Sequence, residues 1–281
     1  MGVLLADTAG LDLKRTLDSG QAFRWRWDGP VAAGVLGRRV VRLTQAPGGV
    51  RLLGADGDRV AAAVRRYLGV LPSRAHPRRA ETALREDRVL ARILPHTSGI
   101  SLLAQDPWET FISFIISQNN NIPKIMRSIE GLSRALGASL GDGVYAFPGP
   151  ERLAAARMRT LAASSLGYRA PYVRAAARLV ADGRLDLTAL ARAELEAARE
   201  ALLAVPGVGA KVGDCVLLFG LGHRTAFPVD VWVRRAVEQL YFRGRRLRLD
   251  DIQAFARARF GPHAGYAQQH LFAYARGRLR P

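Results

Sequence analysis

Two patterns of apolar and polar positions divide the chain. From Leu11 to about Leu53, short stretches rich in Val, Trp and Phe are separated by Gly and Pro, as in residues 21–27 and 39–43. Alternating stretches with turn residues between them are typical of antiparallel strands. After about Asp56, apolar residues recur at helical spacing almost to the end of the chain, with Gly and Pro at the breaks.

These patterns predict an α+β protein in which a small N-terminal antiparallel β-sheet domain precedes a mainly α-helical body. We place the sheet domain, with flanking helices, at residues 1–95 and the helical body, which could form two subdomains, at residues 96–281. A chain of 281 residues that is 49% hydrophobic is long enough to build two or three subdomains that share a core.

One helix start is well marked within the predicted body. Asp106 can cap the helix, Pro107 suits its first turn, and Glu109 can reach back to complete a capping box. The helix is then expected to present three apolar side chains to a core, namely Phe111, Phe114 and Ile115.

The charge of the chain favours a polyanionic partner. Lys and Arg total 42 against 24 Asp and Glu, a formal charge of +18, and nucleic acid is the obvious candidate. Coding bias toward Arg on solvated faces is the other explanation, since a run such as residues 243–248 need bind nothing. Charge alone leaves both explanations open.

Cysteine and histidine usage argues against metal chemistry. The single cysteine, Cys215, excludes an intramolecular disulfide, a cysteine-ligated iron–sulfur cluster and a Cys-rich zinc module. The five histidines show no metal-ligand spacing and no paired nucleophile, so we interpret them as structural or surface residues: His76, His96, His223, His263 and His270. No metal site is predicted from the side chains.

The N-terminus and the apolar runs indicate a protein that does not enter a membrane. Residues 1–10 lack the basic and then apolar pattern of a signal peptide, and no apolar run approaches the roughly 20 residues that span a bilayer. We expect a cytoplasmic, nucleoid-associated location in a bacterium, or a nuclear one in a eukaryote.

A helical hairpin is predicted at about residues 195–220. One apolar stripe precedes a glycine turn and another follows it: Leu195, Ala198, Leu202 and Val205, then Val212, Cys215 or Val216, and Phe219. The turn itself, Pro206 with Gly207, Val208 and Gly209, allows positive φ and close backbone approach. Its amides beside a helix N-terminus suit one DNA phosphate, although many glycine hairpins are purely structural.

Two residues near this turn carry candidate chemistry. Lys211 starts the second helix, where the positive end of the helix dipole disfavours an ammonium group and so favours the neutral amine that a nucleophile needs. Asp230 follows 19 residues later and can cap a helix that starts near Val231. A solvated lysine and a simple cap are the alternatives on spacing alone.

With these flanking residues the segment resembles the helix-hairpin-helix signature of the DNA base-excision glycosylases, in particular the 8-oxoguanine DNA glycosylases. Further segments match that family in the same order along the chain, from about residue 11 to 275: residues 19–25, 105–109, 113–122, 166–170 and 265–272. The resemblance implies a monomeric enzyme of base excision repair that acts on double-stranded DNA containing oxidised guanine. It implies no cofactor, although a structural monovalent or divalent cation could sit at the hairpin turn.

By this resemblance Lys211 attacks the sugar C1′, forms a Schiff base and permits strand cleavage by β-elimination, with Asp230 stabilising the cationic sugar. The residues expected to form the pocket for the flipped base are Gly20, Cys215, Gln268 and Phe272. Among them, Phe272 and Cys215 would flank the base, Gln268 would bind its Watson–Crick edge, and the Gly20 carbonyl would accept the N7–H that distinguishes 8-oxoguanine from guanine.

The resemblance also assigns contacts to the duplex. Asn119 would fill the vacated stack, Tyr168 would wedge the duplex, and Arg169 would hydrogen-bond the orphaned cytosine. Lys124 stands where a second cytosine-reading Arg is expected, and Trp232 replaces a His after the catalytic Asp. These two departures leave the preference for cytosine open.

Three other functions are alternatives. An alkylated-base glycosylase of the same superfamily typically works without the lysine, so Lys211 argues against it. An iron–sulfur relative acting on oxidised pyrimidines or adenine mispairs would need four cysteines for its cluster, whereas this chain has one; a cluster-free relative stays a minor alternative. A non-catalytic DNA-binding protein could use the same hairpin to hold phosphate, and Lys211→Gln would then leave its DNA affinity intact.

Overall fold

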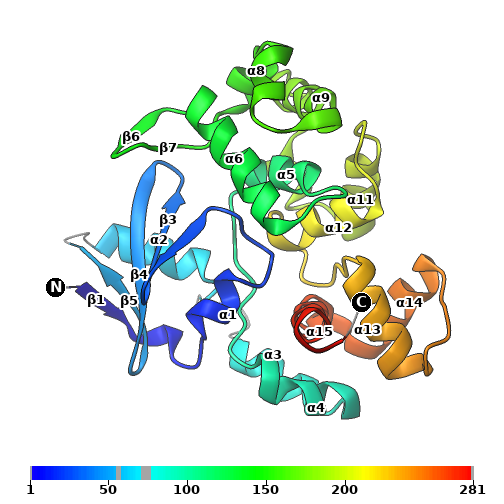
Figure 1. Cartoon of the computed structure of the whole chain (residues 1–281). Helices are drawn as coiled ribbons and strands as arrows, with labels where there is room; N and C mark the ends of the chain where they lie inside the picture. Colours follow the sequence, from blue (N-terminus) through cyan, green and yellow to red (C-terminus); the bar gives the residue numbers. More distant parts are fainter. Residues whose placement is uncertain (1, 55–57, 71–76, 280–281) are drawn as a thin grey trace. The chain divides into compact units, whose positions relative to one another are not determined.

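The computed structural model describes residues 2–54, 58–70 and 77–279, so Asp56 and His76 lie outside the described residues. The strands, shown in Figure 1, are β1 (Gly2–Leu5), β2 (Trp25–Asp28), β3 (Val31–Leu36), β4 (Arg39–Ala46), β5 (Gly49–Leu53), β6 (Ser139–Gly141) and β7 (Val144–Tyr145). The first helices are α1 (Leu13–Leu17), α2 (Asp58–Tyr67), α3 (Pro77–Leu84), α4 (Arg88–Thr97), α5 (Pro107–Ile116), α6 (Ile122–Leu136), α7 (Pro150–Ala154) and α8 (Met158–Ala163). The remaining helices are α9 (Ala170–Ala181), α10 (Leu187–Leu190), α11 (Leu195–Leu203), α12 (Ala210–Phe219), α13 (Val231–Phe242), α14 (Leu249–Phe260) and α15 (Ala264–Arg278). Three 3₁₀ turns complete the described elements, η1 (Ala6–Thr8), η2 (Gly167–Arg169) and η3 (Gly261–His263).

The predicted N-terminal sheet is confirmed. Its five strands follow the order β1-β5-β4-β3-β2, with β1 antiparallel to β5 and β2 antiparallel to β3. Trp25 faces Gly34 across the β2–β3 pair, and a Cβ atom at Gly34 would lie 2.5 Å from the Trp25 ring. Position 34 therefore has room only for glycine.

Three elements depart from the sequence prediction. Residues 2–5 form a strand, whereas the strands were expected only after Leu11. Helix α1 lies within the predicted strand region because the Asp12 side chain caps it by accepting the Arg15 N–H at 2.8 Å. The short β6–β7 hairpin interrupts the part that was expected to be helical.

The chain forms two compact units, each built from segments that are distant in sequence. Unit 1 comprises the described residues within 1–21, 44–104 and 222–281, and unit 2 comprises residues 22–43 and 105–221. The contiguous division at residue 95 remains a prediction. Among the described residues, no helix is both long and apolar enough to cross a membrane.

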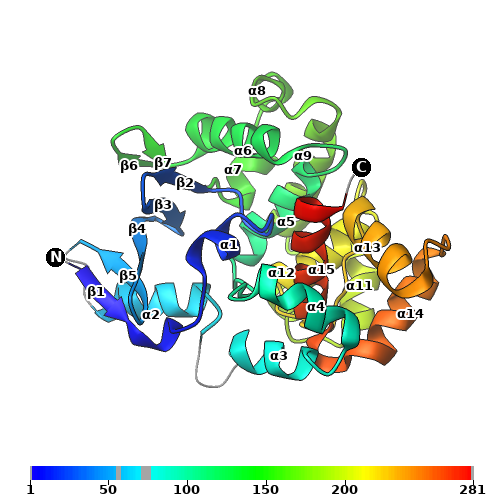
Figure 2. The same ribbon diagram turned by 60° about the horizontal axis from the view of Figure 1, so that its bottom comes forward.

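Helix α15 is the central helix of the helical part of unit 1. It packs against α4, α13 and α14, and Figure 2 shows α4 and α13 beside it. Its residues from Ala264 to Leu271 are buried, and Leu90, Ile93 and Leu94 of α4 are buried as well. This packing fixes the helix that carries Gln268 and Phe272.

Helix α5 has the corresponding place in unit 2, where it packs against α6, α9 and α12 (Figure 1). Its predicted start is confirmed, because the Asp106 side chain accepts the Glu109 N–H at 2.8 Å. All residues from Thr110 to Ile116 are buried, including the three predicted core residues. The capping-box prediction was wrong in one respect: the Glu109 carboxylate pairs with Arg24 at 3.3 Å instead of reaching back.

Candidate active site and nucleic-acid interface

The predicted helical hairpin is present in unit 2 as α11, a six-residue turn and α12. Gly207 has φ +82°, and a Cβ atom there would lie 2.4 Å from the Tyr172 ring of α9. Val208 is buried and its N–H donates to the Val205 carbonyl at 3.0 Å. The turn is thus held by packing on one side, and glycine is required at position 207 for both conformation and space.

Gly209 differs from Gly207. It is the N-cap of α12 with ordinary φ, and the position of its Cβ is open space. The N–H groups of the first turn of a helix have no partner within the helix, so α12 presents amides at an exposed, glycine-flanked end. This end can bind one backbone phosphate of DNA, a contact that does not depend on base sequence.

A buried ion pair, missed in the sequence, joins the two hairpin helices. Arg199 of α11 donates to Asp214 of α12 at 2.9 Å and to Glu196 at 2.6 Å, and the Asp214 side chain is only 1% exposed. Burial opposes the charge on Arg199, but the two carboxylates outweigh it and raise the pKa of Arg199. The pair holds α11 and α12 together below the turn.

Lys211 is the second residue of α12, as predicted. Its Nζ atom donates to the Ser117 hydroxyl at 2.9 Å and lies 5.2 Å from the centroid of the Phe114 ring. Cys215 lies one helical turn further on the same face and is buried. The structure therefore brings Lys211 and Cys215 together in unit 2.

The asparagine-rich turn between α5 and α6 is held by the η2 segment of the same unit. Asn119 has a left-handed φ of +45°, and its side-chain amide donates to the Tyr168 hydroxyl at 3.3 Å. The Tyr168 hydroxyl in turn donates to the Gln118 carbonyl at 3.3 Å, while Tyr168 as a residue remains 53% exposed. Both residues are thus placed together, with Tyr168 available to a partner.

Arg169 was expected to hydrogen-bond the orphaned cytosine, but in the structure its guanidinium binds main-chain carbonyls of its own unit. It is 5% exposed, and its guanidinium donates to the Gln118 carbonyl and to the Asn119 carbonyl, the latter at 3.0 Å. Lys124 is exposed in the first turn of α6, where its N–H donates to the Asn121 side chain at 3.0 Å. In this structure Arg169 supports the asparagine-rich turn between α5 and α6, and cytosine reading by Arg169 or Lys124 remains a prediction.

Asp230 belongs to unit 1, whereas Lys211 belongs to unit 2. The predicted cap is confirmed, since one carboxylate oxygen of Asp230 accepts the N–H of Trp232 at 3.0 Å and of Val233 at 2.8 Å. Those bonds orient the carboxylate at the start of α13. The Trp232 ring lies 5.1 Å from the Arg235 guanidinium.

Gln268 and Phe272 lie one turn apart on α15 of the same unit. The Gln268 amide donates to the Pro228 carbonyl at 3.2 Å, and the neighbouring Gln269 amide donates to the Gln268 oxygen at 3.0 Å. Pro228 lies two residues before Asp230, so Gln268 is tied to the segment that presents the carboxylate. Phe272 is half-buried.

Gly20 follows α1 with φ +78°, and the amide of Gln21 fixes its surroundings. The Gln21 side chain donates to the Ser101 carbonyl at 2.8 Å and accepts the Leu103 N–H at 2.9 Å. Gln21 was assigned no role of its own from the sequence, although it is completely buried. Its place in the segment 19–25, which matches the family, was the available signal.

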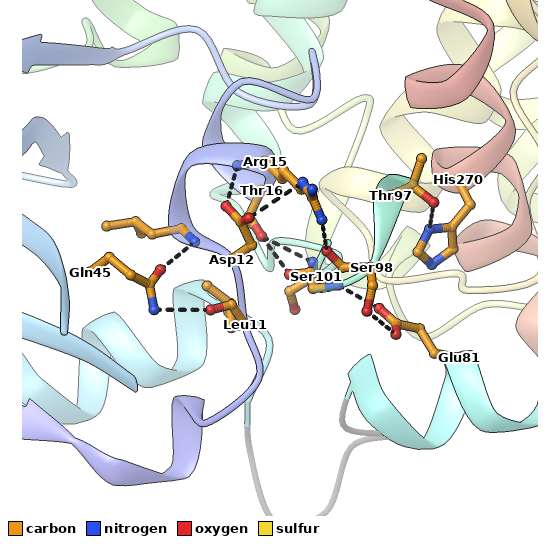
Figure 3. Close-up of polar contacts among 12 residues, drawn as sticks. Leu11, Asp12, Arg15, Thr16, Gln45, Glu81, Thr97, Ser98, Ser101 and His270 are labelled. Carbon is orange, nitrogen blue, oxygen red and sulfur yellow. Dashed lines mark hydrogen bonds and ion pairs between the residues drawn. The ribbon is translucent and has the colours of Figure 1, made fainter. Parts of the chain in front are cut away.

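Residues 97–101 are hydrogen-bonded to α1 and to α15, as Figure 3 shows. Thr16 of α1 donates its hydroxyl to the Gly99 carbonyl at 3.2 Å and accepts the Ser101 N–H at 3.1 Å. His270 of α15 hydrogen-bonds Thr97 at 2.9 Å and is completely buried, and burial lowers the pKa of His270 to about 4. The predicted structural role of His270 agrees with these contacts.

A half-buried carboxylate, that of Glu109, lies at the start of α5. Burial raises the pKa of Glu109 to about 7, although Arg24 opposes the shift. Arg24, which directly precedes β2, also donates to the Tyr145 carbonyl, so it links α5 and β7 within unit 2. In the described ranges, no group of three or more His, Cys, Asp and Glu side chains is placed to hold a metal. A cation at the hairpin turn, which remains a prediction, would need main-chain carbonyl ligands.

A glycine hairpin, together with an aspartate that caps a following helix, is the signature of the helix-hairpin-helix class of base-excision DNA glycosylases. Residues 112–258 match the HhH-GPD superfamily of base excision DNA repair proteins, and residues 3–111 match the N-terminal domain of 8-oxoguanine DNA glycosylase. The chain belongs to the 8-oxoguanine DNA glycosylase family within that superfamily.

Individual relatives agree with this assignment. The chain is 30% identical to the N-glycosylase/DNA lyase OGG1 of Arabidopsis thaliana over 93% of its own length and 76% of the relative. The solved structure of MBOgg1 with a low-affinity DNA ligand superposes with a TM-score of 0.91 at 36% identity, covering 97% of this chain and 94% of that one. The Clostridium acetobutylicum 8-oxoguanine glycosylase/lyase, solved with DNA containing cytosine opposite 8-oxoguanine, gives a TM-score of 0.90 at 32% identity over 96% and 93% of the two chains.

Proposed function

We propose that the chain excises 8-oxoguanine from duplex DNA as a bifunctional glycosylase and AP lyase, with Lys211 as the nucleophile. The observation that carries the proposal is the position of Lys211 at the start of α12, with its amine held by Ser117 beside the hairpin turn. A hydrolytic glycosylase has no need of an amine there.

The reaction starts when the neutral Lys211 amine attacks C1′ of the flipped nucleotide. The bond from C1′ to N9 breaks, and the base leaves with the electron pair and takes a proton. Asp230, oriented by its hydrogen bonds at the start of α13, stabilises the positive charge that develops on the sugar. Opening of the sugar ring gives the Schiff base, and loss of a C2′ proton then expels the 3′ phosphate by β-elimination.

Recognition of the base is assigned to residues with fixed surroundings. The Gly20 carbonyl accepts the N7–H of 8-oxoguanine, and Gln268 binds the Watson–Crick edge. Phe272 and Cys215 flank the ring. The rigid hydrogen-bonding around Gln21 supports the Gly20 assignment, because one carbonyl can discriminate two bases only if its position is fixed.

Borohydride trapping tests the proposal. A duplex carrying 8-oxoguanine should give a covalent adduct with the wild-type chain, while undamaged duplex and Lys211→Gln should give none. The adduct yield with 8-oxoguanine opposite each of the four bases measures the opposite-base preference. Asp230→Asn should bind the lesion duplex but form the adduct much more slowly. Release of free base without an adduct would instead favour a hydrolytic alkylation-repair enzyme. If neither an adduct nor free base forms, a non-catalytic DNA-binding protein is favoured.

A further inference from the structure

The lysine that acts as nucleophile is a long side chain, and it must be held in one conformation to attack. A free lysine carries about 2 kcal/mol of rotamer entropy, and a reacting atom must lie within about 3 to 3.5 Å of its target. Lys211 is only half-buried, so packing alone does not restrain its amine. The contacts of Nζ therefore decide how well the attacking atom is positioned.

Ser117 supplies the hydrogen-bond partner of Nζ within unit 2. Its hydroxyl lies 2.9 Å from Nζ, although the two residues are 94 positions apart in sequence. The same hydroxyl donates its own hydrogen to the Phe114 carbonyl at 2.7 Å. Because that hydrogen is already used, the oxygen presents a lone pair to Lys211 and acts as an acceptor in a fixed direction.

The backbone of Ser117 is fixed as well. It is the C-cap of α5, and its N–H donates to the Ser113 carbonyl at 3.0 Å. The preceding turn supplies the Phe114 ring below Nζ, and that ring stacks on Phe219 of α12 with centroids 5.6 Å apart. The end of α5 thus provides a fixed binding position for the Lys211 amine, formed by the Ser117 hydroxyl and the Phe114 ring.

We infer that Ser117 is a positioning residue for Lys211, holding the amine for attack through the Nζ to Oγ hydrogen bond. The inference rests on the proposed function, because Lys211 is the nucleophile only in that proposal. It assigns no chemistry to Ser117 itself. The turn with Asn119 begins directly after Ser117. The C-terminal end of α5 therefore carries both the residue that holds Lys211 and the segment expected to contact the duplex.

The experiment uses a duplex with a preformed abasic site, so that base recognition does not contribute. Single-turnover borohydride trapping by Ser117→Ala should be about tenfold slower than by the wild-type chain, since a hydrogen bond to an amine is lost. Affinity for the duplex and the melting temperature should stay close to wild type. Ser117→Thr keeps the hydroxyl and should restore most of the trapping rate.

Ser128→Ala is the matched control. Ser128 is a completely buried helix serine of the same unit whose hydroxyl also donates to a main-chain carbonyl, that of Ser165 at 3.1 Å. It should lose the same kind of bond without slowing trapping.

Three outcomes would overturn the inference: wild-type trapping by Ser117→Ala, equal slowing by Ser128→Ala, or no recovery in a Ser117→Thr protein that melts like wild type. If the wild-type chain forms no adduct at all, the role of Lys211 fails and this inference fails with it. An adduct that needs Lys211 but not Ser117 overturns only the inference.

Discussion

At the scale of single residues, two titratable side chains, the completely buried His270 and the half-buried Glu109, have opposite effects on stability as pH changes. His270 has a folded pKa of about 4, below its value of 6.5 in the unfolded chain, so it contributes a loss of stability as pH falls through that window. Glu109 has a folded pKa of about 7, above its value of 4.5 in the unfolded chain, so it contributes a loss as pH rises through its own window. The two effects partly cancel between pH 4.5 and 6.5.

We predict that the contribution of His270 becomes visible in a Glu109→Gln background. Lowering the pH from 7 to 4 should destabilise the variant with His270 by about 3 kcal/mol more than the same variant carrying His270→Gln, because only the unfolded histidine gains a proton easily. Urea unfolding at several pH values measures the difference. Parallel pH curves for the two variants would show that His270 is not held neutral.

At the scale of elements, the hairpin turn contains two glycines with different requirements. Gly207 has a positive φ and packs against Tyr172, whereas Gly209 has ordinary φ and open space at its Cβ position. A substitution at Gly207 should therefore report on conformation and packing, and a substitution at Gly209 on contact with DNA.

We predict that Gly207→Ala lowers the free energy of unfolding by about 1 to 3 kcal/mol, because a methyl group there is strained and collides with an aromatic ring. Gly209→Ala should leave stability within about 0.5 kcal/mol of wild type but weaken binding to any duplex, since the methyl group would stand between phosphate and the amides. Chemical unfolding and fluorescence anisotropy report the two quantities. A Gly209→Ala protein with normal DNA affinity would place the phosphate elsewhere.

The ion pair of Arg199 with Asp214 shows that an element can depend on residues to which the sequence pattern assigned no role. Both hairpin helices were predicted from their apolar stripes, and both are present. The charges between them were not predicted, because burial of an aspartate on a helix depends on what packs over it.

At the scale of the whole molecule, the net charge of +18 should govern affinity for undamaged duplex. We predict that the logarithm of the binding constant falls steeply with the logarithm of salt concentration, by about 0.9 units for each phosphate contacted. A flat salt dependence would contradict an electrostatic interface. Lys124→Ala should reduce the slope by about 1 if Lys124 binds phosphate, whereas an unchanged slope with altered opposite-base preference would identify it as a base reader.

The sequence by itself determined the local features of this protein. The sheet, the hairpin, the start of α5 at Asp106 and the cap at Asp230 all depend on periodicity or on hydrogen bonds within a few residues. The order of motifs was sufficient to identify the family, since motif residues are read directly from the chain.

Only the tertiary structure decided which distant residues meet. Ser117 reaches Lys211 across 94 positions, Gln21 binds the main chain at Ser101 and Leu103, and Arg24 takes Glu109 away from the capping box. The sequence pattern also did not predict that each of the two units is built from segments that alternate along the chain. Hydrogen bonds and ion pairs of this kind follow from packing and desolvation, which depend on the complete surroundings of a side chain and not on its neighbours in sequence.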